Sequence, residues 1–580
     1  MTVVTLAAVI YLGAIPSPPN LMDDVDAVQA QISRNMLESG DWVTARLNGI
    51  AYLEKAPLHY WFTAVSFGVF GVHDWAARIP LALGVVGLCW LVSVFGRWAF
   101  GETEGLFAGV ILASCTGLWL FTRIQIPDAA LTASITLALW SLLRVLDAEE
   151  PHPRVWNALL FASLGVGLLL KGLIAAVLPA GAAAVYLAIS GERRKWRRFR
   201  LGEGLALLLL VAAPWHVLAT LRNPPWFDFT MKSEPGQYRG FFWFFFLNEH
   251  LFRFLNMRHP RYYNTVPRYL FWLLHLVWLF PWTAHLAGLR KLGYRPIDRA
   301  ARTRLLALCW AGFVLVFFTF STTQEYYSMP AYPALALLLA SGLARGGRAV
   351  DWGARITAAL ALAVSALLFG LWGLSLGRAA PGDISRALSR NVELYTLSLG
   401  HMADLTLGAF AYLRTPLVVA AVAFLAGGVC AWKLRGQRLV LSLACMIALF
   451  FFAARLALKA FDPYMGSRAL AERLLRSPEG RLIVDNQYYA FSSVFFYTNR
   501  RALLLNGRIN NLEYGSYAPG APDVFIDDSE FREIWRKPDR AYLCVEGPQV
   551  GRIERLVGRQ ALIPVVESGG KHLFTNQPLP

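Results

Sequence analysis

Apolar runs of similar length recur from residue 1 to about residue 459, and short polar stretches separate them. A run of about 20 residues with few charges can cross the hydrocarbon core of a membrane as a helix. The first run has no basic segment before it and no small-residue cleavage site, so we do not expect a signal peptide. We predict about thirteen spanning helices, at 1–16, 77–98, 104–121, 128–146, 155–170, 172–189, 203–221, 266–288, 304–320, 329–344, 353–375, 413–432 and 439–459. The predicted fold class is a polytopic α-helical membrane protein.

Three long loops interrupt this pattern, and two segments of the first one have helical periodicity. Apolar residues recur at helical spacing in 27–42, which is typical of a helix lying on the membrane surface. Segment 59–75 predicts a second such helix, with aromatic residues at interfacial depth. The long loops are 17–76, 222–265 and 376–412.

The chain after residue 460 changes to short apolar runs between turn residues. We predict a hairpin around Gly569-Gly570 and a helix at 529–536. The predicted strands are 481–486, 493–498, 502–507, 523–527 and 541–546. We therefore expect two domains: a transmembrane domain at 1–459, and a soluble α/β domain at 460–580.

The distribution of charge predicts an orientation. The chain is 56% hydrophobic and only 16% charged, with a net charge of +17. Six Lys or Arg residues lie in 191–200 and six more in 290–304, whereas 122–127 holds only Arg123 and 321–328 holds none. Positive residues concentrate in cytoplasmic loops, so the long loops and the C-terminal domain should face outward. This placement argues against nucleic acid as a partner, because the basic residues follow the membrane rather than one binding face.

Acidic residues occur at two predicted outer helix ends. Asp23, Asp24 and Asp26 follow the first span, and Asp128 begins the fourth, five residues after Arg123. Such acids can simply stabilise a helix N-terminus. The alternative is a carboxylate that accepts a proton or orients a nucleophile at the membrane surface.

Basic and tyrosine side chains lie on the same predicted side. Lys55, Lys171, Arg253 and Arg258 could form a pocket for phosphate, with Tyr327 as an additional donor. The competing interpretation is that the cations snorkel to the headgroups and that the tyrosine is an interfacial anchor.

A metal site is a weaker alternative. Glu54, His250 and His259 are suitable ligand types, but no HExxH-type spacing supports them, so no cofactor is firmly predicted and a divalent metal is only an alternative. The sequence also has no P-loop, no GxSxG, and no GxGxxG in a βαβ context. Chemistry outside the cytoplasm without a nucleotide site implies an activated substrate delivered in the membrane, such as a lipid-phosphate sugar.

Several segments, taken in order, resemble the type C glycosyltransferases. The densest resemblance is at 22–62, and "RIQIPDAAL", "GLLLKG", "EHLFRF" and "EYYSMPAYPALALLLA" continue it to about residue 345. The sequence is most similar to the bacterial aminoarabinose (lipid A) transferases and their protein O-mannosyltransferase relatives.

The resemblance implies an inverting transfer of sugar from a polyprenyl-phosphate donor to lipid A, a glycan or a protein. It implies a bacterial inner-membrane location with the site facing the periplasm. The donor phosphate would be held by Lys55, Arg253 and Tyr327, with Arg123 and Lys171 nearby. The acceptor would be served by Asp128 and an acid of the first loop. The family has a contiguous Asp-Glu pair where this chain has Asp24-Val25-Asp26, so we favour Asp24, with Asp26 second.

Two other classes of protein remain open. A multispanning transporter or flippase of lipid-linked sugars would also need many spans, but transporters concentrate ionisable residues near the midplane, whereas these acids lie in loops. A non-enzymatic assembly subunit would leave the cationic pocket unexplained.

Overall fold

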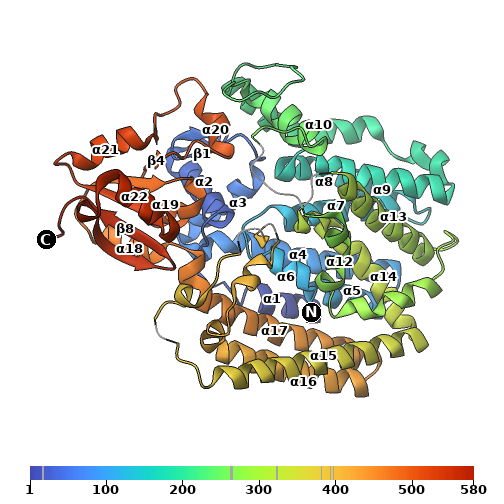
Figure 1. The fold of residues 1–580 in the computed structure, drawn as a ribbon. Coiled ribbons are helices and arrows are strands. Elements are labelled where there is room, and N and C mark those ends of the chain that lie inside the picture. Colours follow the sequence, from blue (N-terminus) through green and yellow to red (C-terminus); the bar gives the residue numbers. More distant parts are fainter. Residues whose placement is uncertain (16–18, 261–265, 322–323, 381, 392–393, 396) are drawn as a thin grey trace.

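The computed structural model describes residues 1–15, 19–260, 266–321, 324–380, 382–391, 394–395 and 397–580. The ends of two predicted loops, 17–18 and 261–265, therefore lie outside the described residues. A helical part and a smaller α/β part lie side by side, and elements from the N-terminal quarter of the chain lie between them (Figure 1).

Nine helices in the described part of the chain are long and apolar enough to cross a membrane. A bent pair, α12 (Arg268–Trp278) and η3 (Trp282–Lys291), turns by 97° and would make a tenth. The nine are α4 (Asp74–Ala99), α7 (Asp128–Leu146), α8 (Pro153–Lys171), α10 (Leu201–Arg222), α13 (Arg299–Phe320), η4 with α14 (Glu325–Arg345), α15 (Arg348–Ser375), η8 with α16 (Ala409–Lys433) and α17 (Gly436–Met465). A polytopic helical architecture is confirmed, while the count of thirteen stays a prediction.

The other three predicted spans are shorter helices. Span 1–16 contains α1 (Thr2–Tyr11), and span 172–189 contains α9 (Ile174–Ser190). Span 104–121 is divided between α5 (Glu102–Ala113) and α6 (Thr116–Phe121). The helices α1 and α9 are apolar but shorter than the nine, and span 104–121 is broken into two short helices.

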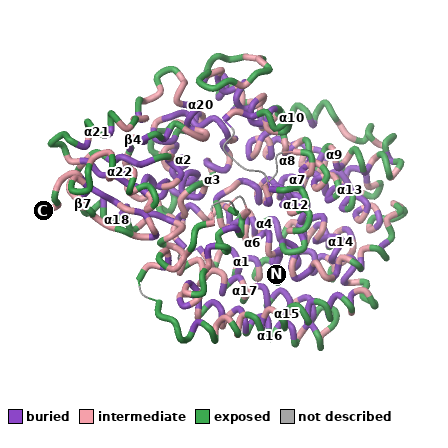
Figure 2. The backbone as a smooth tube through the Cα atoms, in the orientation of Figure 1, coloured by how far each residue is buried: buried purple, intermediate pink, exposed green. Residues whose placement is uncertain are grey.

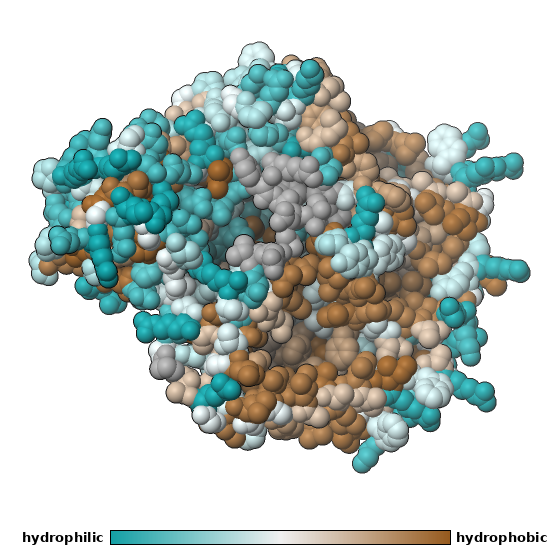
Figure 3. Space-filling view, in the orientation of Figure 1, coloured by the Kyte–Doolittle hydropathy of each residue, from teal (hydrophilic) through white to brown (hydrophobic). Residues whose placement is uncertain are grey.

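The helix that carries the predicted tyrosine lies at the centre of the helical part. In its most apolar window, 89% of η4 with α14 is buried, compared with 22% for α15 at the periphery (Figure 2). Apolar side chains cover most of the visible outer face of the helices, and polar side chains cover the α/β part (Figure 3). This division agrees with a membrane-embedded bundle bearing a polar domain.

The first long loop forms a compact unit beside the bundle. It contains α2 (Val25–Ser39), a two-stranded hairpin of β1 (Arg46–Leu47) and β2 (Ile50–Ala51), and α3 (Leu58–Phe70). The hairpin turn is Asn48-Gly49, with φ of 52° and 85°. Positive φ at both central residues is the geometry that matches the twist of a two-residue hairpin, and Asn-Gly adopts it readily.

The other long loops and connections hold short helices. These are η1 (Glu192–Arg198), α11 (Gly240–Phe242), η2 (Trp243–Phe252), η5 (Ile384–Ala387) and η7 (Gly400–Asp404), with η8 (Ala409–Leu413) leading into α16 (Arg414–Lys433).

The C-terminal part is a six-stranded sheet in the order β5-β4-β3-β6-β8-β7. The four strands from β5 to β6 are parallel, and β8 and β7 form an antiparallel hairpin beside β6. The strands are β3 (Arg481–Asp485), β4 (Leu503–Leu505), β5 (Phe525–Ile526), β6 (Ala541–Glu546), β7 (Ile563–Ser568) and β8 (Lys571–Thr575). Its helices are α18 (Arg468–Leu475), η9 (Tyr488–Phe491), α19 (Ser492–Thr498), α20 (Asn511–Ser516), α21 (Asp528–Arg536), η10 (Gly547–Gln549), α22 (Val550–Val557) and η11 (Arg559–Ala561).

One predicted strand is wrong, because 493–498 belongs to helix α19. All residues from Ser492 to Phe496 are buried, so the segment has no alternation of buried and exposed positions. A short, fully buried apolar run has the same hydrophobic signature as a strand or as a helix.

The first loop and the C-terminal part share one hydrophobic core. Val28, Ile32 and Met36 of α2 pack in the same buried cluster as Leu470 of α18 and Phe495 of α19. The helix α17 also runs past the predicted domain boundary to Met465. The α/β part is therefore bound to the first loop by packing as well as by the chain.

Candidate active site

The loop between β2 and α3 presents Glu54 and Lys55. Glu54 is buried, and its carboxylate accepts hydrogen bonds from Lys55 Nζ at 2.5 Å and from the Tyr52 hydroxyl at 3.1 Å. The side chain of Lys55 remains 24% exposed, so its ammonium group is accessible from one side. Glu54 and Lys55 thus form an ion pair that is buried on the glutamate side and partly exposed on the lysine side.

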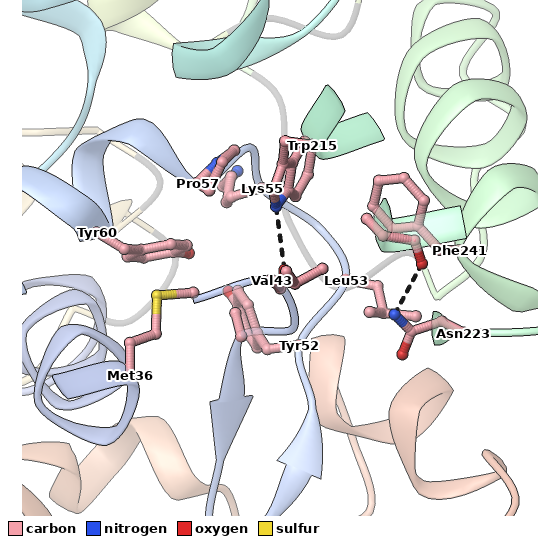
Figure 4. A pocket seen from close by; sticks show the side chains of 12 residues that line it. Met36, Val43, Tyr52, Leu53, Lys55, Pro57, Tyr60, Trp215, Asn223 and Phe241 are labelled. Atoms are coloured by element: carbon pink, nitrogen blue, oxygen red, sulfur yellow. Dashed lines mark hydrogen bonds between the residues drawn. The ribbon is translucent and has the colours of Figure 1, made fainter. Parts of the chain in front are cut away.

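A small cavity behind this loop shows how it is supported (Figure 4). The cavity is about 10 Å³, which is about the room that one water needs. Trp215 donates a hydrogen bond from Nε1 to the carbonyl of Val43 at 3.1 Å across this region. The packing fixes the back of the loop, and the cavity is too small for a sugar or a lipid phosphate.

The loop that contains η2 brings two arginines to the same place. Arg253 Nη1 lies 3.1 Å from Glu249 and 3.6 Å from Glu54. Arg258 Nε donates to the other oxygen of Glu249 at 2.5 Å. Both predicted arginines therefore join the Glu54–Lys55 pair through carboxylates.

Tyr327 of η4 (Glu325–Ala331) connects this group to the membrane helices. Its hydroxyl accepts a hydrogen bond from Arg253 Nη2 at 2.7 Å, and its ring centroid lies 4.9 Å from Lys171 Nζ. Lys171, at the end of α8, also lies 2.5 Å from Asp128, the first residue of α7. The structure thus brings together Lys55, Arg253, Tyr327, Lys171 and Asp128.

A glycine permits the close approach at the end of α8. Gly172 has a φ of +72°, and a Cβ atom at this position would lie 2.2 Å from His250 Nε2. Only glycine satisfies both conditions without displacing the imidazole. The pair Lys171-Gly172 thus ends the helix where the lysine reaches Asp128.

Cations outnumber carboxylates among the described residues of this cluster. Four cations, Lys55, Lys171, Arg253 and Arg258, face three carboxylates, Glu54, Glu249 and Asp128, which leaves one positive charge. Burial alone would raise the pKa of Glu54, but Lys55, Arg258 and Arg253 lower it to about 2. Burial raises the pKa of Glu249, against the opposing effect of Arg258. The excess charge makes the cluster suitable for one anion.

Asp26 is enclosed and fully engaged in the structure. Its carboxylate accepts from the backbone N–H groups of Met22 and Gln125, both at 3.1 Å, and lies 3.4 Å from Arg78. Burial raises its pKa, and Arg78 opposes this effect. Through Gln125 and Arg78, Asp26 therefore connects α2 to the helical bundle.

Asp24 differs because its side chain is exposed to solvent. The surrounding protein nonetheless displaces much of its hydration, and this desolvation, with a smaller contribution from Asp23, raises the pKa of its carboxyl to about 6. Its backbone N–H donates to the carbonyl of Tyr489 at 2.8 Å, and the Tyr489 hydroxyl lies 3.2 Å from that of Tyr52. One tyrosine therefore separates Asp24 from the Glu54–Lys55 loop.

Arg123 is placed differently from the other predicted phosphate ligands. Its guanidinium lies 5.0 Å from the ring centroid of Trp119, in the electrostatic surroundings of Arg78 and Asp26. Its described contacts are with Trp119 rather than with the residues around Tyr327. Its role as a phosphate ligand stays a prediction.

The metal interpretation finds no support in the described residues. No group of three or more His, Cys, Asp or Glu side chains among them is arranged to hold a metal ion. His250 Nδ1 lies 2.5 Å from the carbonyl of Phe245, and burial lowers the pKa of this imidazole to about 4. His259 Nε2 lies 3.7 Å from Glu513, while Glu54 is bound by cations and hydrogen-bond donors.

The sequence did not reveal one group from the C-terminal part. Asn511 of α20 accepts a hydrogen bond from Arg258 Nη2 at 2.5 Å, and its amide donates to Glu54 and, at 3.2 Å, to Tyr52. Asn511 is more than 450 residues from Glu54 along the chain, so no local spacing could reveal the contact. By contrast, Asn48-Gly49 is a hairpin signal in the sequence that could have predicted how the Glu54 loop is oriented.

Comparisons with known proteins show which proteins this chain is similar to. Residues 54–217 match the family described as dolichyl-phosphate-mannose-protein mannosyltransferase. The undecaprenyl phosphate-alpha-4-amino-4-deoxy-L-arabinose arabinosyl transferase of Aeromonas salmonicida is 29% identical over 352 residues, which cover 60% of this chain and 59% of that protein. The corresponding protein of Erwinia tasmaniensis is 25% identical over 87% of this chain and 84% of its own length.

The fold is also that of a solved structure. The crystal structure of ArnT from Cupriavidus metallidurans bound to undecaprenyl phosphate superposes with a TM-score of 0.78, at 22% identity, over 99% of this chain and 97% of that one. The resemblance expected from the sequence is thereby confirmed.

Proposed function

We propose that this protein, which shares the fold of ArnT, is an inverting glycosyltransferase that moves a sugar from a polyprenyl-phosphate donor to an acceptor outside the cytoplasm. One observation carries the proposal. Arg253 and Lys171 contact Tyr327 on the most buried of the described spanning segments, Glu54 links Lys55 to Arg253, and the described cations of the cluster outnumber its described carboxylates. A phosphate at a lipid headgroup would supply the missing negative charge.

The chemistry of the transfer explains why such a cluster is useful. An acceptor oxygen forms a bond to the anomeric carbon while the bond from that carbon to the phosphate oxygen breaks. Negative charge then grows on the leaving polyprenyl phosphate. Cations that are already in place stabilise this transition state more than the donor, and so accelerate the reaction.

The acceptor needs a base rather than a cation. We assign this part to Asp24, because it is the exposed member of the group Asp23, Asp24 and Asp26, and desolvation by the surrounding protein raises its pKa to about 6. A base with such a pKa can remove a proton from a hydroxyl or amine as the new bond forms, and general-base catalysis contributes about 10²–10⁴-fold. Asp128, held by Lys171 at 2.5 Å, orients the acceptor beside the phosphate site.

The names of the relatives support a donor lipid for this chain, and the acceptor stays open among three classes. The named relatives act on an undecaprenyl phosphate-linked aminoarabinose, so we propose an undecaprenyl-type donor for this chain. The acceptor classes are lipid A, a glycan and a protein. We place the protein in a bacterial inner membrane, with the cluster and the α/β part facing the periplasm, in agreement with the basic segments at 191–200 and 290–304.

The experiment uses the purified protein in proteoliposomes with undecaprenyl-phosphate-linked aminopentose or hexose and an envelope-lipid extract. Mass spectrometry should detect a covalently glycosylated product. Lys55→Ala should abolish it, whereas Lys232→Ala, at an exposed lysine of loop 222–265, should not. Near-normal transfer by Lys55→Ala would refute the phosphate assignment. Sugar lipid that crosses the bilayer without a covalent product would favour a transporter.

The natural acceptor can be found from the cell. Envelope lipids, glycans and proteins from cells with and without the gene are compared by mass spectrometry. The class that loses a hexose or aminopentose identifies both donor and acceptor.

A further inference from the structure

Asp24 has a backbone conformation that is unusual for a residue with a side chain. Its φ is 71° and its ψ is −142°, immediately before helix α2. This region is adopted almost only by glycine, because a Cβ atom clashes with the backbone there. Such a conformation persists only where surrounding contacts impose it.

The contacts that impose it come from the C-terminal part. The N–H of Asp24 donates to the carbonyl of Tyr489 at 2.8 Å, and the Ser492 hydroxyl donates to the carbonyl of Asp24 at 3.1 Å. Both peptide groups that flank the Asp24 side chain are therefore fixed by residues more than 460 positions away in the chain.

Asp23, the residue before Asp24, is also held by the C-terminal part. Its carboxylate accepts from the backbone N–H of Ser493 at 2.7 Å and from the Ser467 hydroxyl at 2.5 Å, and it forms an ion pair with Lys571. The side chains of Asp23 and Lys571 are only 7% and 9% exposed. Lys571 also donates to Ser467 at 3.1 Å and to the carbonyl of Ala490 at 3.0 Å, so all its hydrogen-bonding capacity is directed here.

The hairpin turn before Lys571 is itself docked on the membrane part. Gly569 and Gly570 have φ of +64° and +73°, and a Cβ atom on Gly569 would lie 1.7 Å from the carbonyl of Pro463 in α17. Only glycine allows the turn to approach the helix so closely. The packing of this turn against α17 therefore fixes the position from which Lys571 reaches Asp23.

We propose that Lys571 and Asp23 are positioning residues, through which the C-terminal part holds Asp24 with its carboxylate directed at the acceptor. This inference rests on the proposed function, because it assigns the strain at Asp24 to catalysis. Lys571 binds the carbonyl of Ala490 and Asp23 binds the N–H of Ser493, so the pair holds the segment whose Tyr489 and Ser492 fix the two peptide groups of Asp24. An ion pair that served only to attach the domain would not need to hold this segment beside a strained, solvent-exposed acid.

The test compares four variants of the full-length protein in proteoliposomes with the undecaprenyl-phosphate sugar donor. In Lys571→Met and Asp23→Asn, kcat should fall about 10–100-fold while the donor KM stays within about twofold, because a displaced base slows the reaction without weakening phosphate binding. Lys571→Arg should restore most of kcat. Lys537→Met, at the other lysine of the C-terminal part, which is exposed, should behave as wild type.

Hydrogen–deuterium exchange of segment 22–26 gives a second readout that needs no turnover. The Asp24 N–H is one of its bonded amides, so exchange there should accelerate in Lys571→Met and Asp23→Asn and remain slow in Lys537→Met. If either of the first two variants does not fold, the other decides the outcome.

The proposal is overturned if both variants retain wild-type kcat and exchange. It is also overturned if kcat, donor KM and the unfolding temperature all change together, since that pattern shows a merely structural ion pair. A wild-type protein that transfers no sugar overturns the proposed function instead, and the exchange experiment still shows whether Lys571 holds segment 22–26.

Discussion

The pH dependence of transfer depends on the surroundings of Asp24. The carboxylate acts as a base only when ionised, so activity should be lost as the pH falls through the pKa of the group, which desolvation raises to about 6. With that pKa, roughly one-tenth of the protein is active at pH 5, half at pH 6 and nine-tenths at pH 7. An ordinary aspartate would still be more than about 90% ionised at pH 5.

The measurement is kcat/KM for the donor between pH 4.5 and 8 in proteoliposomes, because this ratio reports groups of the free enzyme. We expect about a tenfold rise between pH 5 and the plateau. The phosphodiester of the donor keeps its charge over this range, so the rise belongs to the protein. Asp24→Asn should lower kcat by at least about 10²-fold, while Asp523→Asn, at an exposed aspartate, should leave it unchanged. An acid limb centred near pH 4, or one that persists in Asp24→Asn, would refute the reasoning.

Three further predictions concern the phosphate cluster. Asn511→Asp should raise the donor KM about 30-fold, and by more than Asn511→Ala does. The reason is that it adds a negative charge facing Glu54, where charge-assisted hydrogen bonds are worth about 2 kcal/mol. Equal effects of the two variants would contradict this reasoning. Tyr327→Phe should lower kcat/KM about tenfold, because it removes the oxygen 2.7 Å from Arg253, and an unchanged ratio would show that the ring alone suffices. Treatment with EDTA should leave transfer within about twofold of the untreated protein; a loss that Zn²⁺ or Mn²⁺ restores would show a metal site.

The sequence predicted the parts of the site that are local in the chain. Lys55 and Arg253 lie in predicted outward loops, Lys171 and Tyr327 lie beside predicted outer helix ends, and the side of the membrane that they face follows from the basic segments. That reasoning brings them to one level of the membrane. The structure adds that Arg253 and Lys171 contact Tyr327, and that Glu54 links Lys55 to Arg253.

The residues that were missed depend on packing between distant segments. Asn511 and Tyr489 reach the first loop only because α2 and α18 share a hydrophobic core, and no periodicity records such a pairing. Arg123 is five residues from Asp128 in the chain, but its guanidinium lies over the ring of Trp119. Distance along the chain therefore does not show which of these side chains make contact.

The shared core has a consequence for biosynthesis. The helix α2 is synthesised before α18 and α19, so its apolar face is not covered until these later helices have formed. Until then the loop carrying Asp24 and Lys55 remains unfinished, and its exposed apolar face is a target for chaperones or proteases. We therefore expect a nascent or truncated chain to lack a finished site, because the first loop is completed only when the distal segment packs against it.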